Sequence, residues 1–166
     1  MQKLVDATGR VWVVEINVAT IKRVRVLAGI NLLEVIEGEL IERLSSDPVL
    51  LCDVLYAVCQ PQAAKEDVSD EAFGEGLAGD AITEATTALI EALVAFFPEP
   101  RRRLLTKAAA KYQSVQSKAL AMVEAKLDSP QMETRILDQL ANELVRQDLS
   151  GSSSASPASP ESIPGH

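Results

Sequence analysis

The sequence predicts a mostly α-helical protein with a small N-terminal β-hairpin, an α+β fold in which a helical domain is followed by two amphipathic helices and a disordered tail. Apolar residues make up 47% of the 166 residues but aromatic residues only 4%, so the core must be aliphatic, which favours helices. A β-rich pattern around a Thr-Gly turn opens the chain. Apolar residues then recur at three- and four-residue spacing up to a Ser/Pro-rich end.

The stretch KLVDATGRVWVVEINV predicts the hairpin. Thr8 and Gly9 lie between two β-rich runs, and VWVVEI has the Val, Trp and Ile content of a strand. Trp12 is the only tryptophan of the chain, and we expect it to pack in the core rather than to form a platform for a ligand.

A helix is predicted over ATIKRVRVLAGI, with Ile21, Val24 and Ala28 on its apolar face and Gly29 at its end. Its remaining surface carries a small basic patch. We expect this patch to be solvated: Lys22, Arg23 and Arg25.

Two helix-start signals divide the next thirty or so residues into predicted helices. Asn31 begins a Leu-rich segment with Glu34 at the capping-box position, and Gly38 is expected to divide it into two short helices. Asp47 followed by Pro48 is a strong helix start, because a capping carboxylate precedes a proline at the first helical position. The helix that they open is predicted to run to about Gln60, before Pro61.

Three glycines have the GxGxxG spacing of a dinucleotide-binding loop: Gly74, Gly76 and Gly79. Such a loop needs a buried strand before it, but the preceding residues, AAKEDVSDEA, are polar and acidic. No Lys or Arg between Glu66 and Glu99 would offset the acidic side chains next to a pyrophosphate. We therefore expect a short helix over 70–78, capped by Ser69 and stopped by Gly79 as its C′ residue, with Asp80 capping the next helix.

The clearest helical pattern lies between Asp80 and Phe97. One apolar stripe comprises Ile82, Ala85, Leu89, Leu93 and Phe96. A seam of small residues would let another helix approach closely: Ala81, Ala85, Ala88 and Ala92. Phe96, Phe97 and Pro98 are expected to close the helix, and the two phenylalanines are core residues or anchors for a partner.

The composition changes after Pro100. Six basic residues and no acidic one lie between Arg101 and Lys118, and an apolar seam continues to Met122. Ser129 and Pro130 are expected to start a further helix. We predict three parts: residues 1–100 as hairpin plus helical domain, 101–149 as a basic amphipathic extension, and 150–166 as a disordered Ser/Pro-rich tail. The two helices of the extension could form a hairpin, pack on the domain, or await a partner helix.

The net charge and the spacing of the cysteines argue against several classes of protein. The net charge of −8 argues against nucleic acid as a partner, although residues 101–149 carry 9 basic and 6 acidic side chains. Cys52 and Cys59 lie seven residues apart, so within one helix their Cα atoms are roughly 10 Å apart, too far for a disulfide. Free buried thiols suit a reducing cytoplasm. We find no signal peptide and no long apolar run, so we expect a cytoplasmic protein without a membrane segment.

Residue types also limit the chemistry. The sole histidine is His166, which excludes a Ser-His-Asp or Cys-His arrangement within the fold and leaves no fixed nitrogen ligand for a metal. No phosphate-binding GxxxxGK[ST] loop occurs. Carboxylates adjacent in sequence, such as Asp70 and Glu71 or Glu37 and Glu39, are the remaining enzymatic alternative. We expect a protein that is not an enzyme and that has no cofactor, metal or catalytic residue.

Three phrases together resemble the tail assembly chaperones of tailed phages and prophages. They are DATGRVWVVEINVATIKRVR, INLLEVIEGELIERLSSDPVLLCDVLYAVC and VSDEAFGEGLAGDAITEATTALIEALVAFFP. The resemblance covers roughly residues 4–100, and beyond them only the helical, polar character matches. It implies a non-enzymatic protein of the host cytoplasm that binds the helical tape-measure protein while the tail is assembled, with tail-tube subunits as a further candidate partner.

A chaperone for a long, aggregation-prone helical protein needs exposed apolar helix faces within a charged surface. The residues that we expect to bind the partner are Phe96, Phe97, Leu105, Tyr112, Val115, Met122, Ile136, Leu140 and Leu144. Two alternatives stay open: a structural tail or head–tail component retained in the virion, and a bacterial adaptor protein. Self-association is open as well.

Overall fold

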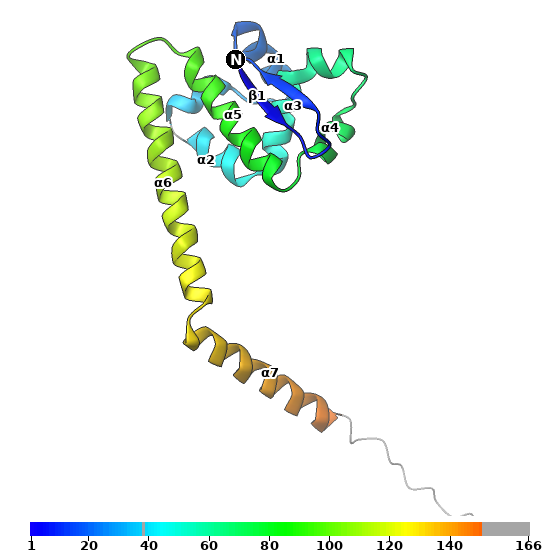
Figure 1. Ribbon diagram of the computed structural model, residues 1–166, viewed down its shortest axis with the longest axis vertical. Coiled ribbons are helices and arrows are strands. Elements are labelled where there is room, and N and C mark those ends of the chain that lie inside the picture. The colour runs from blue at the N-terminus through cyan, green and yellow to red at the C-terminus, as the bar shows by residue number, and fades with distance from the viewer. Residues whose placement is uncertain (38, 151–166) are drawn as a thin grey trace, which may run out of the picture. The chain divides into compact units, whose positions relative to one another are not determined.

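The computed structural model describes residues 1–37 and 39–150 (Figure 1). Within them, a two-stranded antiparallel sheet is followed by helices only, which confirms the predicted fold class. Contacts divide the chain into two compact units, Met1–Val115 and a second that begins at Gln116. The boundary predicted after residue 100 coincides with the start of a long helix, whereas the division falls inside that helix. Of the tail predicted as disordered, 150–166, Ser150 is the last residue of a helix, which corrects the prediction at that position, and residues 151–166 lie outside the described residues.

The hairpin pairs β1 (Gln2–Val5) with β2 (Val11–Val14), and Leu4 lies opposite Trp12. One face of the sheet is buried, because Leu4, Trp12 and Val14 all point into the core. The Trp12 ring packs edge-on against Phe73, with 4.8 Å between the ring centroids. Trp12 is therefore a packing residue, as predicted.

Asp6 organises the turn between the strands. Its carboxylate accepts hydrogen bonds from the backbone N–H and hydroxyl of Thr8, from the backbone N–H of Arg10 and from the indole N–H of Trp12, at 2.6 to 2.9 Å. Burial works to raise the pKa of this carboxyl, but the four hydrogen bonds together outweigh it, so the pKa lies below the ordinary 3.8.

Helix α1 (Val18–Leu27) is capped by Asn17, whose side chain accepts a hydrogen bond from the backbone N–H of Thr20. Gly29, with φ of +68°, follows the last turn as predicted. The Leu-rich segment forms a 3₁₀ helix, η1 (Leu32–Glu37), and helix α2 (Glu39–Ser46). Gly38, which was expected to divide them, lies outside the described residues.

Helix α3 (Pro48–Lys65) begins as predicted, because the Asp47 carboxylate accepts hydrogen bonds from two backbone N–H groups at 3.0 Å. The predicted end before Pro61 is wrong, since the helix continues through that proline. Pro61 has no N–H to offer the carbonyl of Ala57, one turn earlier. The Arg23 guanidinium supplies a donor to this carbonyl, at 2.6 Å from the Ala57 oxygen, and a second guanidinium nitrogen donates to the Val58 carbonyl at 2.8 Å. The expectation that Arg23 is solvated is thereby corrected.

Helix α4 (Asp70–Gly76) is capped by the Ser69 hydroxyl as predicted, but it ends two residues early. The hairpin turn causes this early end, because the backbone N–H of Ala7 donates to the Gly76 carbonyl at 2.8 Å. Gly79 is the N-cap of the next helix and not the C′ residue of α4, and its φ is +57°. Asp80 is consequently the first helical residue and not the cap.

Helix α5 (Asp80–Phe96) packs against both strands and against α2 and α3. All four alanines of the predicted seam are buried, and so are Leu89 and Leu93. Small side chains on this face let the helix axis approach β1 closely. Ile82 and Phe96, at the ends of the predicted stripe, are only partly buried.

Two long helices complete the described chain: α6 (Arg101–Leu127) and α7 (Pro130–Ser150). The first turns of α6 belong to the first unit, because Leu105 is buried in its core. In α7, no residue with a described side chain is buried.

Candidate partner-binding surface

The nine residues predicted to bind a partner separate into three groups by exposure. Phe97 and Leu105 are buried, with 4% and 5% of their surface exposed, and they belong to the core of the first unit. Phe96 and Tyr112 are partly buried against that core. The prediction is therefore corrected for Phe97 and Leu105, because the start of α6 packs on the same core as α5.

The other five residues are largely exposed. Their exposed fractions are 55% for Val115, 73% for Met122, 50% for Ile136, 55% for Leu140 and 63% for Leu144. They lie on α6 and α7, and exposed apolar side chains at this density are typical of an interaction surface.

On α6, one apolar row changes its environment along the helix. Leu105, Ala109 and Tyr112 follow one another at spacings of four and three, and all three pack against the core of the first unit. Further along, the same helix exposes Leu120, Met122, Val123 and Leu127. The sequence reading identified Met122 only, although the three- and four-residue spacing from Tyr112 through Val123 also marks the others.

On α7, the apolar surface is broader than the predicted single row. Ile136, Leu140 and Leu144 recur every four residues, and Leu137 and Val145 widen the row on one side. We call these five residues the α7 apolar face: Ile136, Leu137, Leu140, Leu144 and Val145. Each of them exposes at least half of its surface.

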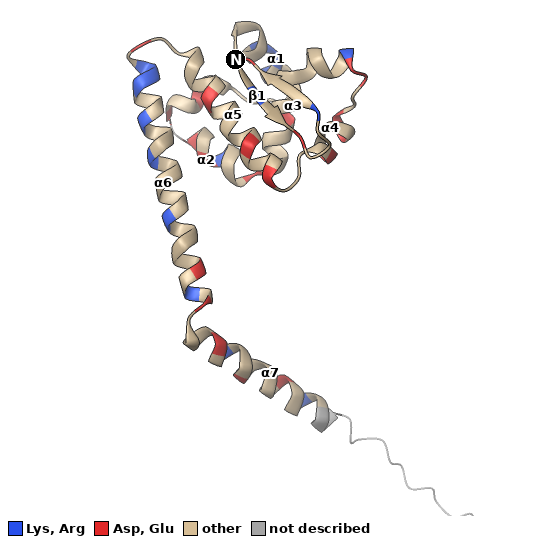
Figure 2. Cartoon of the chain, viewed as in Figure 1, with Lys and Arg blue, Asp and Glu red and all other residues tan. Residues whose placement is uncertain are grey.

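Charge is distributed unevenly along the described chain (Figure 2). Helix α5 carries Asp80, Glu84 and Glu91 and no basic residue, whereas α6 begins with Arg101, Arg102 and Arg103. Arg102 is bound to the end of α5, donating to the Phe97 carbonyl at 3.0 Å. The charged side chains that surround the exposed apolar residues would keep them in solution.

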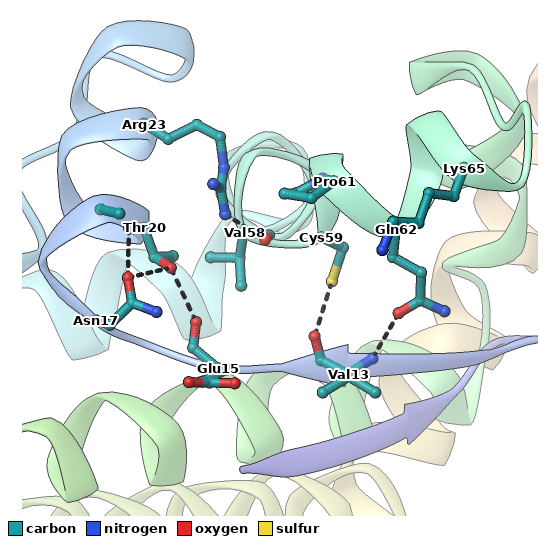
Figure 3. Close-up of a pocket in the computed structure, with 11 residues that line it drawn as sticks. Val13, Glu15, Asn17, Thr20, Arg23, Val58, Cys59, Pro61, Gln62 and Lys65 are labelled. Carbon is teal, nitrogen blue, oxygen red and sulfur yellow. Dashed lines mark hydrogen bonds between the residues drawn. The ribbon is translucent and has the colours of Figure 1, made fainter.

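A separate pocket of about 470 Å³ lies in the first unit among β2, α1 and α3 (Figure 3). Its polar atoms are largely used within the fold. The Gln62 side chain accepts from the Val13 N–H at 3.0 Å and donates to the Val11 carbonyl at 2.8 Å. Arg23 holds two carbonyls of α3, and the Thr20 hydroxyl donates to the Glu15 carbonyl at 3.2 Å. This arrangement joins the three elements.

The thiol in this pocket is a poor nucleophile. Burial raises the pKa of Cys59 to about 12, against a smaller opposing effect of Arg23, and its sulfur contacts the Val13 carbonyl at 3.7 Å. Burial, with help from Asp70 and Asp53, raises the pKa of Cys52 to about 11. Both cysteines are free thiols, as expected, but only Cys59 is fully buried, and Cys52 is partly exposed. Both stay protonated at neutral pH.

Of the three glycines with dinucleotide-loop spacing, Gly76 is required by packing, whereas Gly79 has a positive φ and open space around it. A Cβ atom added to Gly76 would lie 2.9 Å from an Asp6 carboxylate oxygen, so the hairpin already occupies the space beside this glycine. Among residues 1–37 and 39–150, no group of three or more His, Cys, Asp or Glu side chains could hold a metal ion. Within the same ranges, no helix is both long and apolar enough to span a membrane.

Comparison of the chain with protein-family models, curated proteins and solved structures found no match.

Proposed function

We propose that this protein binds a helical partner protein through the exposed apolar residues of α6 and the α7 apolar face, and that it has no catalytic role. The observation that carries the proposal is the contrast in burial along the chain. The first unit has a core in which Leu44, Leu55 and Leu93 are completely buried. In α7, by contrast, no residue with a described side chain is buried, and Leu137, Leu140 and Leu144 are more than half exposed. A helix with such a face is typically completed by a second helix.

The energetics of such a contact are sufficient. Fully covering one Leu, Ile or Val side chain contributes about 1.5–3 kcal/mol, and these residues are already half exposed or more. Covering the five residues of the α7 apolar face would contribute several kcal/mol before the cost of association.

The choice of partner is supported by the resemblance of residues 4–100 to tail assembly chaperones. We propose that the partner is the tape-measure protein of a tailed phage, bound in the host cytoplasm during tail assembly. A tape-measure protein is long and helical, so it offers repeated apolar helix faces to a protein with exposed apolar helices.

Co-expression with the tape-measure protein of the same genome tests the proposal. We expect the full chain to raise the soluble fraction of that protein and to co-purify with it. The double variant Leu140→Ser/Leu144→Ser should lose both effects. The matched control Gln139→Ser/Asn142→Ser alters exposed polar residues of the same helix and should keep them. Equal behaviour of the two variants, or no effect of the unaltered chain, would refute the proposal.

Mass spectrometry of purified phage particles separates this role from that of a structural component. An assembly chaperone should be missing from finished particles. Stoichiometric peptides of this chain in the particle would assign it to the tail or the head–tail joint instead.

A further inference from the structure

The two edges of the hairpin differ in how their backbone groups are paired. On β2, the Gln62 side chain binds both the Val13 N–H and the Val11 carbonyl, and the Cys59 thiol contacts the Val13 carbonyl. A single amide thereby takes the place of a neighbouring strand along this edge. Addition of another strand to β2 is blocked by α3.

The register then fixes which groups of β1 point outward. Val13 and Val11 turn their backbone groups toward α3, so their cross-strand neighbours Lys3 and Val5 must turn theirs away from β2. The pairing of Asp6 N–H with the Arg10 carbonyl at 2.9 Å follows the same alternation. Among the described residues, no helix or loop hydrogen-bonds to the outward backbone groups of Lys3 and Val5.

A groove of about 330 Å³ lies along this edge, between β1 and α5. Its lining residues are Gln2, Lys3, Thr83, Glu84, Thr87, Ala88 and Glu91. Figure 1 shows β1 and α5 as neighbours in the first unit. The groove provides room beside the strand whose backbone groups are unpaired.

Charge decides which segment the groove fits. Glu84 and Glu91 line it together with one basic residue, Lys3, so the lining carries a net negative charge, and α5 has no basic residue that would offset its two carboxylates. Pairing of β1 with β1 of a second copy would bring the carboxylates of two α5 helices together, which is unfavourable. An extended segment with Lys or Arg at alternate positions places all of its positive charges on one face, where they can meet Glu84 and Glu91.

We propose that β1 binds an extended, basic segment of a partner protein by strand addition, with backbone hydrogen bonds to Lys3 and Val5 and ion pairs to Glu84 and Glu91. The site lies wholly in the first unit, so it is separate from the helix-binding surface of the proposed function. The protein then has two separate binding sites: β1 binds an extended segment, and the α7 apolar face binds a helix.

The test uses the full chain and a ten-residue peptide of alternating Thr and Lys, with alternating Thr and Glu as the control peptide. Amide hydrogen exchange measured by NMR reports on the outward N–H groups directly. Saturating Thr-Lys peptide should slow exchange at Lys3 and Val5 at least tenfold and leave Val13 unchanged, whereas the Thr-Glu peptide should have no effect.

Two variants, each with a matched control, test the backbone and charge contributions separately. Val5→Pro removes one outward N–H without removing a bond between β1 and β2, so it should weaken binding about tenfold, and Val5→Ala should not. Glu84→Gln/Glu91→Gln should weaken binding similarly, whereas Glu42→Gln/Glu71→Gln, away from the groove, should not. Leu140→Ser/Leu144→Ser should leave peptide binding intact, which separates this proposal from the proposed function.

Three results would overturn the proposal. Changes in the NMR chemical shifts of α5 without slower amide exchange at Lys3 and Val5 would mean that the peptide is held by charge attraction only. A dimer in sedimentation that Val5→Pro converts to a monomer would assign the edge to a second copy. No change with either peptide would mean that the groove takes no extended segment.

Discussion

Asp6 is a buried carboxylate on which both the hairpin turn and the end of α4 depend. It accepts four hydrogen bonds, two of them from side chains, and it lies against Gly76. Asp6→Asn keeps the shape but loses the charge and turns an acceptor into a donor that faces other donors. We expect a loss of about 2 kcal/mol in the free energy of unfolding, measured by urea denaturation. A loss below about 0.5 kcal/mol would show that the turn holds without the carboxylate.

The same carboxyl group predicts a pH dependence. Because folding lowers the pKa of Asp6 below 3.8, the unfolded chain binds its proton at higher pH than the folded one. The stability from Asp6 is therefore fully present above pH 3.8 and is lost as the pH falls through the lower, folded pKa. The difference in unfolding free energy between the natural chain and Asp6→Asn should shrink when urea titrations are carried from neutral pH to about pH 2. A constant difference would mean that the pKa is not lowered.

At the scale of elements, α3 shows why some boundaries were predicted and others were not. The cap at Asp47 and the cap at Ser69 act on backbone groups two or three residues away, so local sequence contains the whole interaction. Where α3 passes Pro61, the donor that the Ala57 carbonyl lacks comes from Arg23, 38 positions before the proline in the sequence, so local sequence does not contain this interaction. The Gly79 assignment failed for a similar reason, since the hairpin turn sets the end of α4.

We expect the effects of substituting Arg23 and Pro61 on the free energy of unfolding to be coupled. Arg23→Met should lower the free energy of unfolding by about 1–3 kcal/mol, because it leaves the Ala57 carbonyl without a donor. In a Pro61→Ala background the backbone N–H of residue 61 returns to that carbonyl, so the same substitution should cost clearly less. A double-mutant cycle by urea denaturation measures the difference. Additive effects within about 0.3 kcal/mol would mean that Arg23 does not compensate for the proline.

At the scale of the whole molecule, the sequence predicted the helical character of the interaction surface but not its limits. The apolar spacing on α6 looks the same before and after Tyr112, yet only the first part meets a core. Spacing identifies a face, and whether another element covers it depends on the tertiary fold. Phe97 and Leu105 were therefore assigned to a partner although the chain itself covers them. The free edge of β1 left no signal in the sequence. Every residue type has the same backbone carbonyl, and all but proline have the same N–H, so residue types do not show which backbone groups are unpaired.

Two identical substitutions in different parts of the molecule test this division between core and surface. Leu93 in α5 is completely buried, and Leu140 in α7 is 55% exposed. Leu93→Ala should lower the free energy of unfolding by about 2–5 kcal/mol, because it leaves a cavity. Leu140→Ala should change it by less than about 0.5 kcal/mol, since water already reaches that side chain and alanine favours helices. Urea denaturation of the free protein measures both, and a loss at Leu140 comparable to that at Leu93 would mean that the α7 apolar face is already covered before any partner binds.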